Sequence, residues 1–176
     1  ENDVYLTSKD MLEENDLPTY EAQVTHKENN LENIKLYNNL NKKPRQHRIW
    51  FYSKLFHNNL LDKGLVSMNQ IDISQRRYCG DFMEQEYVEE FAKTLPSLIY
   101  GVSNEIEDTG YYINRINHKV CDDSWISVIS EARFEDEEGT IFLSEKVFKP
   151  VASHHPFIVM GNKHSLKEMK KLGYKT

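Results

Sequence analysis

The chain has 176 residues, enough for one domain with a real core, and its composition of 39% hydrophobic and 28% charged residues is typical of a soluble protein. A net charge of −6 argues against a protein that coats nucleic acid or an anionic membrane. No apolar run approaches the roughly 20 residues of a membrane span, and the two cysteines suggest no disulfide framework, so a reducing, cytoplasmic setting is the simpler interpretation.

The pattern predicts one α/β domain preceded by a polar segment. Residues 1–33 are polar with scattered acids, and we expect them to be irregular, peripheral or a remnant of a preceding region. Residues 34–176 form the predicted domain. The last five residues, Leu-Gly-Tyr-Lys-Thr, combine a helix stop with the start of a strand, so we expect the natural chain to continue past Thr176.

A strand, a polar turn and a helix follow one another at the start of the predicted domain. Residues 34–38 predict a short strand, and the Asn-rich stretch that follows predicts a turn. Residues 45–59 predict a helix, because their apolar positions recur with a period near 3.6. Arg45, His47 and Arg48 fall near the start of this helix. In open α/β sheets this order is usual for a loop that faces phosphate.

Three interpretations of this basic segment stay open. The first is a solvated surface with no ligand. The second is phosphate binding at the helix start through Arg45 and Arg48. The third is a nucleic-acid patch over residues 42–48, which the short basic run and the acidic chain disfavour.

The middle of the chain gives weaker signals. Residues 67–73 can include a strand, and residues 84–94 predict a helix whose acids lie early, where the helix dipole favours them. Residues 111–120 alternate poorly between polar and apolar positions, so we expect a helix there in place of a strand.

The clearest strand covers residues 125–130, which are rich in β-branched and aromatic side chains. Glu131 follows at its carboxyl end, where ligands gather in open α/β sheets. Residues 135–139 then include four acids, which repel one another, so we expect an exposed, mobile loop without a metal. His154 and His155 have no carboxylate at metal-ligand spacing and are interpreted as loop residues.

Most of the functional interpretation depends on the stretch that begins at Ser144. This residue can cap a helix whose first turn carries Glu145 and Lys146, and residues 157–160 then predict a short, fully buried strand. The free N–H groups and positive dipole of a helix start suit a diphosphate. Lys146 can add a charge there, and Glu145 can bind ribose hydroxyls. The alternative is a solvated Glu-Lys pair on an amphipathic helix.

Three blocks in this order resemble the donor-nucleotide half of α1,3-fucosyltransferase-like glycosyltransferases. They are Ile-Ser-Glu-Ala at 129–132, Phe-Leu-Ser-Glu-Lys at 142–146, and a strand from Pro to Gly at 156–161. The Asn-rich turn and the helix that opens with Arg45 and Arg48 also match. The Phe-Lys-Pro after Glu-Lys and the Leu-Gly-Tyr-Lys-Thr end are similar to phage and bacterial hypothetical proteins of glycosyltransferase type.

The resemblance covers residues 34–176 and implies a Rossmann-like parallel sheet with flanking helices, one half of a GT-B fold. It implies an inverting, metal-independent displacement with no cofactor. The donor would be a nucleotide-diphosphate sugar, with GDP-linked sugars among the candidates, and the acceptor is unknown. The implied donor contacts are Arg45, Arg48, Glu131, Ser144, Glu145 and Lys146. The general base would come from an acceptor domain, for which residues 1–33 are too few.

Two departures from the family pattern affect the donor contacts. Ala132 stands where the family often has Asn, and the loop over residues 133–141 is longer than usual. Two other classes of function stay open: a non-catalytic nucleotide-binding module with the same fold, and a nucleic-acid-associated phage protein. If the strands are parallel, Arg48, Glu145 and Lys146 should converge at the carboxyl edge of the sheet.

Overall fold

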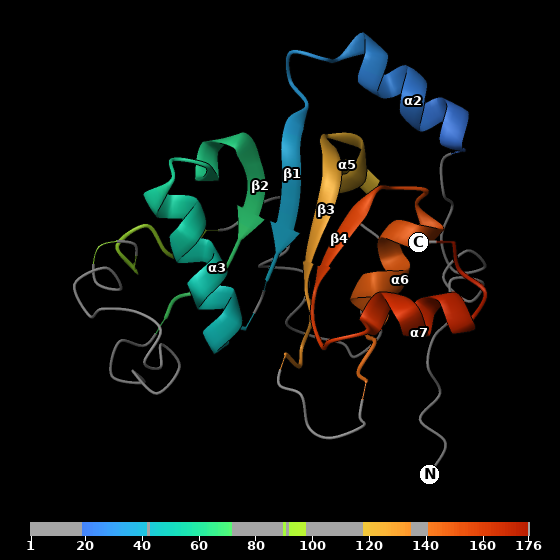
Figure 1. The fold of residues 1–176 in the computed structure, drawn as a ribbon. Coiled ribbons are helices and arrows are strands. Elements are labelled where there is room, and N and C mark those ends of the chain that lie inside the picture. The colour runs from blue at the N-terminus through green and yellow to red at the C-terminus, as the bar shows by residue number, and fades with distance from the viewer. Residues whose placement is uncertain are drawn as a thin grey trace, which may run out of the picture.

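The computed structural model describes residues 19–41, 43–71, 90, 92–97, 118–134 and 141–175. Its centre is a four-stranded sheet in which every pairing is parallel and the order is β2-β1-β3-β4 (Figure 1). The strands are β1 (Lys35–Leu40), β2 (Gly64–Ser67), β3 (Ser124–Ser130) and β4 (Phe157–Met160). The helices are α2 (Tyr20–Asn29), α3 (Gln46–His57), α5 (His118–Asp122), α6 (Glu145–Ala152) and α7 (Ser165–Lys171), with a short 3₁₀ helix at Leu61–Lys63.

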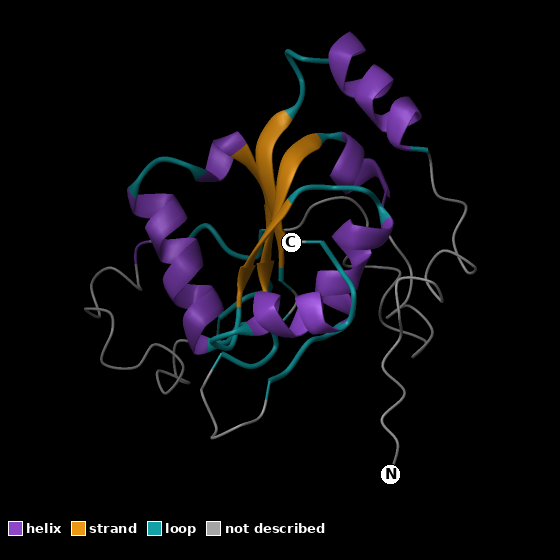
Figure 2. Cartoon of the chain, turned by 45° about the vertical axis from the view of Figure 1, so that its right-hand side comes forward, coloured by secondary structure: helices purple, strands orange, loops and turns teal. Residues whose placement is uncertain are grey.

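Helices cover both faces of the sheet, so the predicted Rossmann-like α/β fold is confirmed (Figures 1 and 2). On one face, Ile49, Tyr52 and Leu55 of α3 pack with Tyr37 and Val66 of the sheet. On the other face, α6 and α7 pack against β3 and β4 in a second core cluster that includes Ile129, Val147, Phe148 and Met169. The two βαβ connections therefore place α3 and α6 on opposite sides.

Successive strands are added to the sheet in opposite directions on the two sides of one pair of neighbouring strands. β1 leads through α3 to β2 on one side of the sheet, whereas β3 leads through α6 to β4 on the other side. β1 and β3 lie next to each other, so the strand order switches between them. In open parallel sheets, the crevice at the carboxyl ends of such a pair is where ligands bind. The topology alone therefore gives the expected position of a site.

β1 extends further than predicted, because residues 39 and 40 also belong to the strand and not to a turn. The reason is a set of contacts with β3. Asn38 Nδ2 donates to Ser127 Oγ at 2.9 Å, and Asn39 Nδ2 donates to the carbonyl of Val128 at 2.6 Å. Both Asn side chains are buried, and these bonds satisfy amide groups that would otherwise favour a turn.

The two outer strands also differ from the predictions. β2 begins at Gly64, ahead of the predicted stretch at 67–73, and all four of its residues are buried. β4 was predicted to be fully buried, but Ile158 is 56% exposed. Within the described part of the chain β4 pairs with β3 alone, so it forms an edge of the sheet and keeps one side open.

The amino-terminal segment contains a helix, which corrects the expectation of an irregular one. α2 begins after Thr19, whose hydroxyl accepts the amide of Ala22 at 3.2 Å. Near its end, the Lys27 ammonium lies 5.6 Å from the centre of the Trp125 ring. The helix was missed because its apolar residues form no continuous stripe, so its position depends on such polar and cation–π contacts.

His155, interpreted as a loop residue, is buried beside β3 with 3% of its surface exposed. Its Nε2 lies 2.8 Å from the carbonyl of Ser124, which requires the proton on Nε2, so Nδ1 accepts the hydroxyl of Ser127 at 2.9 Å. Burial lowers the pKa of His155 to about 4, a shift that the bond to Ser124 opposes and the nearby Lys27 increases. A neutral imidazole is therefore part of the core.

Several predictions fall on parts of the chain outside the described residues. They include most of the helix at 84–94, most of the helix at 111–120 apart from α5, and the acidic loop at 135–139. Within the described ranges, no helix is long and apolar enough to cross a membrane.

Candidate functional site

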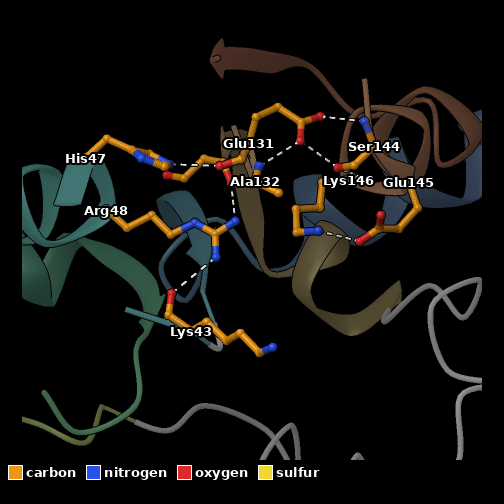
Figure 3. Close-up of polar contacts among 9 residues, drawn as sticks. Lys43, His47, Arg48, Glu131, Ala132, Ser144, Glu145 and Lys146 are labelled. Carbon is orange, nitrogen blue, oxygen red and sulfur yellow. Dashed lines mark hydrogen bonds and ion pairs between the residues drawn. The ribbon is translucent and has the colours of Figure 1, made fainter. Parts of the chain in front are cut away.

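The starts of α3 and α6 lie at the switch point, beyond the carboxyl ends of β1 and β3 (Figure 3). α3 begins after Arg45, whose side chain makes no capping bond. α6 begins after Ser144, whose hydroxyl accepts the amide of Lys146 at 3.3 Å, as the predicted cap requires. Each helix start directs backbone N–H groups and the positive end of its dipole to this edge, which favours an anion.

Arg48 reaches from α3 to the end of β3 and is only 4% exposed. Its Nη2 donates to the carbonyl of Ser130 at 3.0 Å, and its Nη1 donates to the carbonyl of Lys43 at 3.2 Å. Among the described residues, its Nε has no hydrogen-bond partner, although it is buried. The guanidinium is therefore held in place while part of its donor capacity stays unused.

The surroundings of Arg48 lower its pKa. Burial lowers the pKa of Arg48 to about 10, the nearby Arg45 increases the shift, and the carboxylates of Glu131 and Glu145 oppose it. Arg48 still carries its charge at neutral pH, because a pKa of about 10 lies well above 7. Arg45 is exposed, so one of the two predicted arginines is fixed at the site and the other lies at its solvated rim.

His47 gives α3 a second contact with the end of β3. Its Nε2 donates to the carbonyl of Glu131 at 2.8 Å, and its ring stacks on Phe134 with the centroids 5.3 Å apart. The sequence indicated His47 only as one of several basic residues near a helix start. His47 holds the start of α3 to the end of β3 through a contact between residues 84 positions apart, which no local pattern signals.

Glu131 was expected among the ligand contacts, and in the structure both of its carboxylate oxygens bind groups of the protein itself. Oε1 accepts the amide of Ser144 at 2.9 Å. Oε2 accepts the hydroxyl of Ser144 at 2.6 Å and the amide of Ala132 at 3.0 Å. The residue is 0% exposed. Glu131 thus joins the end of β3 to the start of α6, as Figure 3 shows.

Glu145 and Lys146 form an ion pair in the first turn of α6 (Figure 3). Their side chains are 21% and 32% exposed, so the pair is only partly solvated. Lys149 lies one turn further along, and burial lowers its pKa, a shift that Glu145 opposes and Lys146 increases. The Glu145 carboxylate thus interacts with two cations. With Arg48 and Glu131 included, three cations and two carboxylates of the described residues lie around this helix start, which leaves an excess of positive charge.

The structure brings three of the predicted residues, Arg48, Glu145 and Lys146, to the same end of the sheet from segments far apart in sequence (Figure 3). Ser144 and Glu131 lie behind them and hold α6. The sequence did not indicate Lys149, although its spacing of four residues from Glu145 on one helix face was a usable signal.

Within the part of the chain that the structure describes, no group of three or more His, Cys, Asp or Glu residues could hold a metal ion. No protein-family model matches the chain, and searches of curated proteins and of solved structures found no match. What the fold defines is a Rossmann-like α/β domain with a cationic site at its switch point.

Proposed function

We propose that this domain binds a nucleotide-diphosphate sugar and is the donor-binding part of a glycosyltransferase, whose acceptor is held by another domain. The observation that supports the proposal most is the position of Arg48 and Lys146 beside two helix starts at one switch point. A diphosphate there would meet two helix dipoles and two cations. The resemblance to α1,3-fucosyltransferase-like enzymes, which includes the same residues, also supports the proposal.

The site suits stabilisation of a leaving group. In the proposed inverting step, an acceptor oxygen attacks the anomeric carbon, the bond to the diphosphate breaks, and negative charge grows on the departing phosphate oxygens. Donors that are fixed in advance are most effective where charge develops. Arg48 is already fixed, and Lys146 would exchange Glu145 for a phosphate oxygen. Glu145 would then be free to accept bonds from ribose hydroxyls.

A non-catalytic nucleotide-binding module is the second candidate, and one observation favours it. Among the described residues, the two acids that lie at the site are engaged, Glu131 with Ser144 and Ala132, and Glu145 with Lys146. Glu131 is held by its three bonds, and in the bound state proposed above Glu145 accepts from the ribose. Neither of the two then takes the proton of an acceptor hydroxyl, so turnover requires another base. Without one, the same site would bind a nucleotide and release it unchanged.

Calorimetric titration with GDP, UDP, ADP and a single-stranded oligonucleotide tests the proposal. We expect saturable binding of at least one nucleoside diphosphate. If the acceptor is held by another domain, as proposed, the 176-residue chain alone should show little transfer activity. Turnover of a sugar nucleotide in the presence of that domain and an acceptor would distinguish a transferase from a binding module. Binding of the oligonucleotide alone would overturn both candidates in favour of nucleic-acid association.

A further inference from the structure

We propose that Glu131 is a positioning residue, whose buried carboxylate sets the start of α6 so that Lys146 and the helix N–H groups face the anion site. The inference rests on the proposed function for its ligand, and it assigns Glu131 a role other than ligand contact.

The three hydrogen bonds of the Glu131 carboxylate all involve groups at the junction of β3 and α6. Ser144 donates two of them, one from its amide at 2.9 Å and one from its hydroxyl at 2.6 Å. The third comes from the amide of Ala132 at 3.0 Å, which turns the chain away from β3. Bonds to an ionised acceptor are among the stronger hydrogen bonds in proteins. With 0% exposure, the carboxylate has no surface left for a ligand in this arrangement.

Packing around Glu131 keeps it in one position. A β-carbon on Gly161 would lie 3.1 Å from Glu131 Cγ and 3.2 Å from its Cβ, so the glycine leaves just enough room for the side chain. Asn162 Oδ1 accepts the amide of Phe142 at 3.1 Å, which holds the same loop from the other side. The approach to α6 is therefore fixed from the ends of both β3 and β4.

The same stretch of backbone also holds α3. Arg48 donates to the carbonyl of Ser130, and His47 donates to the carbonyl of Glu131. Ser130 and Glu131 at the end of β3 thus contact both helix starts. Their backbone carbonyls bind α3, and the Glu131 side chain binds α6. A change in the Glu131 side chain should alter the α6 half of the site and leave the α3 half in place.

The chemistry of a carboxylate is what this position requires. It faces three donors, and only an acceptor on both oxygens can satisfy all of them. In Glu131→Gln, one oxygen becomes an NH₂ group, which faces the Ala132 amide and the Ser144 hydroxyl. In that orientation the hydroxyl can rotate to accept, and the Ala132 amide is left without its partner. In the flipped orientation the Ser144 amide loses its acceptor instead. In both, the charge that strengthens the bonds to Ser144 is lost. Glu131→Gln is therefore expected to loosen the start of α6 while keeping the volume of the side chain.

Two measurements on the full chain test the inference with Glu131→Gln, using Glu168→Gln on α7 as a control. Glu168 is a partly exposed carboxylate that pairs with Lys171 at 2.8 Å, away from the site. The first measurement is amide hydrogen exchange at Ser144, Lys146 and Val147. The second is the affinity for whichever of GDP, UDP and ADP binds the wild type most tightly. Glu131→Ala is a more severe variant, and Glu131→Gln keeps the test usable if Glu131→Ala does not fold.

We expect exchange at the three amides to be at least about tenfold faster in Glu131→Gln, and affinity to fall by roughly tenfold, since a hydrogen bond to a charged group contributes enough for that change. In a Lys146→Ala background, Glu131→Gln should reduce the affinity much less than it does in the wild type. A general loss of stability would not explain that difference.

Unchanged exchange would overturn the inference whatever the ligand. Faster exchange with unchanged affinity would also overturn it. Faster exchange in a protein that binds no nucleoside diphosphate even as wild type would support the positioning role and overturn the proposed function.

Discussion

The ring of Tyr37 lies so close to Gly64 that a β-carbon on the glycine would be 2.3 Å from Tyr37 Cζ. The two residues are register partners in β1 and β2. The Tyr37 hydroxyl donates to the carbonyl of Leu60 at 2.9 Å, which places the ring across the start of β2. The missing side chain at Gly64 is what allows the ring to reach that carbonyl and to hold β2 against β1.

Gly64→Ala is expected to destabilise the fold, because the added methyl group would meet a buried aromatic ring and not a flexible side-chain end. Overpacking of this kind typically costs about 1–3 kcal/mol, and the short contact favours the upper part of that range. Urea unfolding measures the change. Tyr37→Leu in the same background should relieve most of the clash, so strictly additive losses for the two substitutions would contradict the packing described.

Lys146→Ala is expected to weaken nucleoside-diphosphate binding by roughly tenfold to a hundredfold, since a charge-assisted bond contributes about 1.5–3 kcal/mol. The free energy of unfolding should change little, because the lost partner is a partly solvated carboxylate. Lys171→Ala is the matched control, since Lys171 pairs with Glu168 on α7 and is 62% exposed. Equal affinities for wild type and both variants, measured by calorimetry, would remove Lys146 from the site.

The two arginines should behave differently. Arg48→Ala removes the donor from two backbone carbonyls, those of Ser130 and Lys43, so it should lower stability by about 1–3 kcal/mol as well as weaken binding. Arg45→Ala removes an exposed charge and should reduce affinity by only a few fold without changing stability. Chemical unfolding and titration of both variants check this. An Arg48→Ala protein as stable as wild type would show that the buried contacts of Arg48 contribute nothing.

Stability should fall as the pH drops from 7 to 5, with His155 as one cause. Its pKa is about 4 in the folded protein against an ordinary value of 6.5, so the unfolded chain binds the proton more readily. The contribution is therefore fully present above pH 6.5 and is lost progressively toward pH 4. Linkage gives a loss of roughly 2 kcal/mol between pH 7 and 5 for this shift. His155→Gln should be less stable at pH 7 but show a flatter profile in urea unfolding, and an unchanged slope would exclude His155 as the cause.

The parts of the fold that the sequence predicted are those with strong local signals. β3 is rich in β-branched and aromatic residues, and Ser144 is a favourable cap directly before an acid. The parts that were missed depend on tertiary contacts. β2 has only four residues and begins with glycine, and the buried Asn side chains of β1 look like turn residues until β3 supplies their partners.

The candidate site divides in the same way. Its location followed from the order of strands and helices, because parallel strands bring both helix starts to one edge. The roles of individual residues did not follow. Whether Arg48 is buried or solvated, and whether Glu131 faces a ligand or Ser144, depends on distances between segments more than ten residues apart in the chain. No spacing in the sequence encodes those distances.

The switch point has a consequence for how ligand binding and folding are related. Arg48 comes from the βαβ unit that contains α3, and Lys146 comes from the unit that contains α6. A diphosphate held by both would cross-link the two units at their seam, where the described contacts include hydrogen bonds between β1 and β3 and those from Arg48 and His47 to the end of β3. At a concentration a hundred times its Kd, such a ligand adds about 2.7 kcal/mol to the stability of the folded state. Donor occupancy would then decide how firmly the two halves of the sheet hold together.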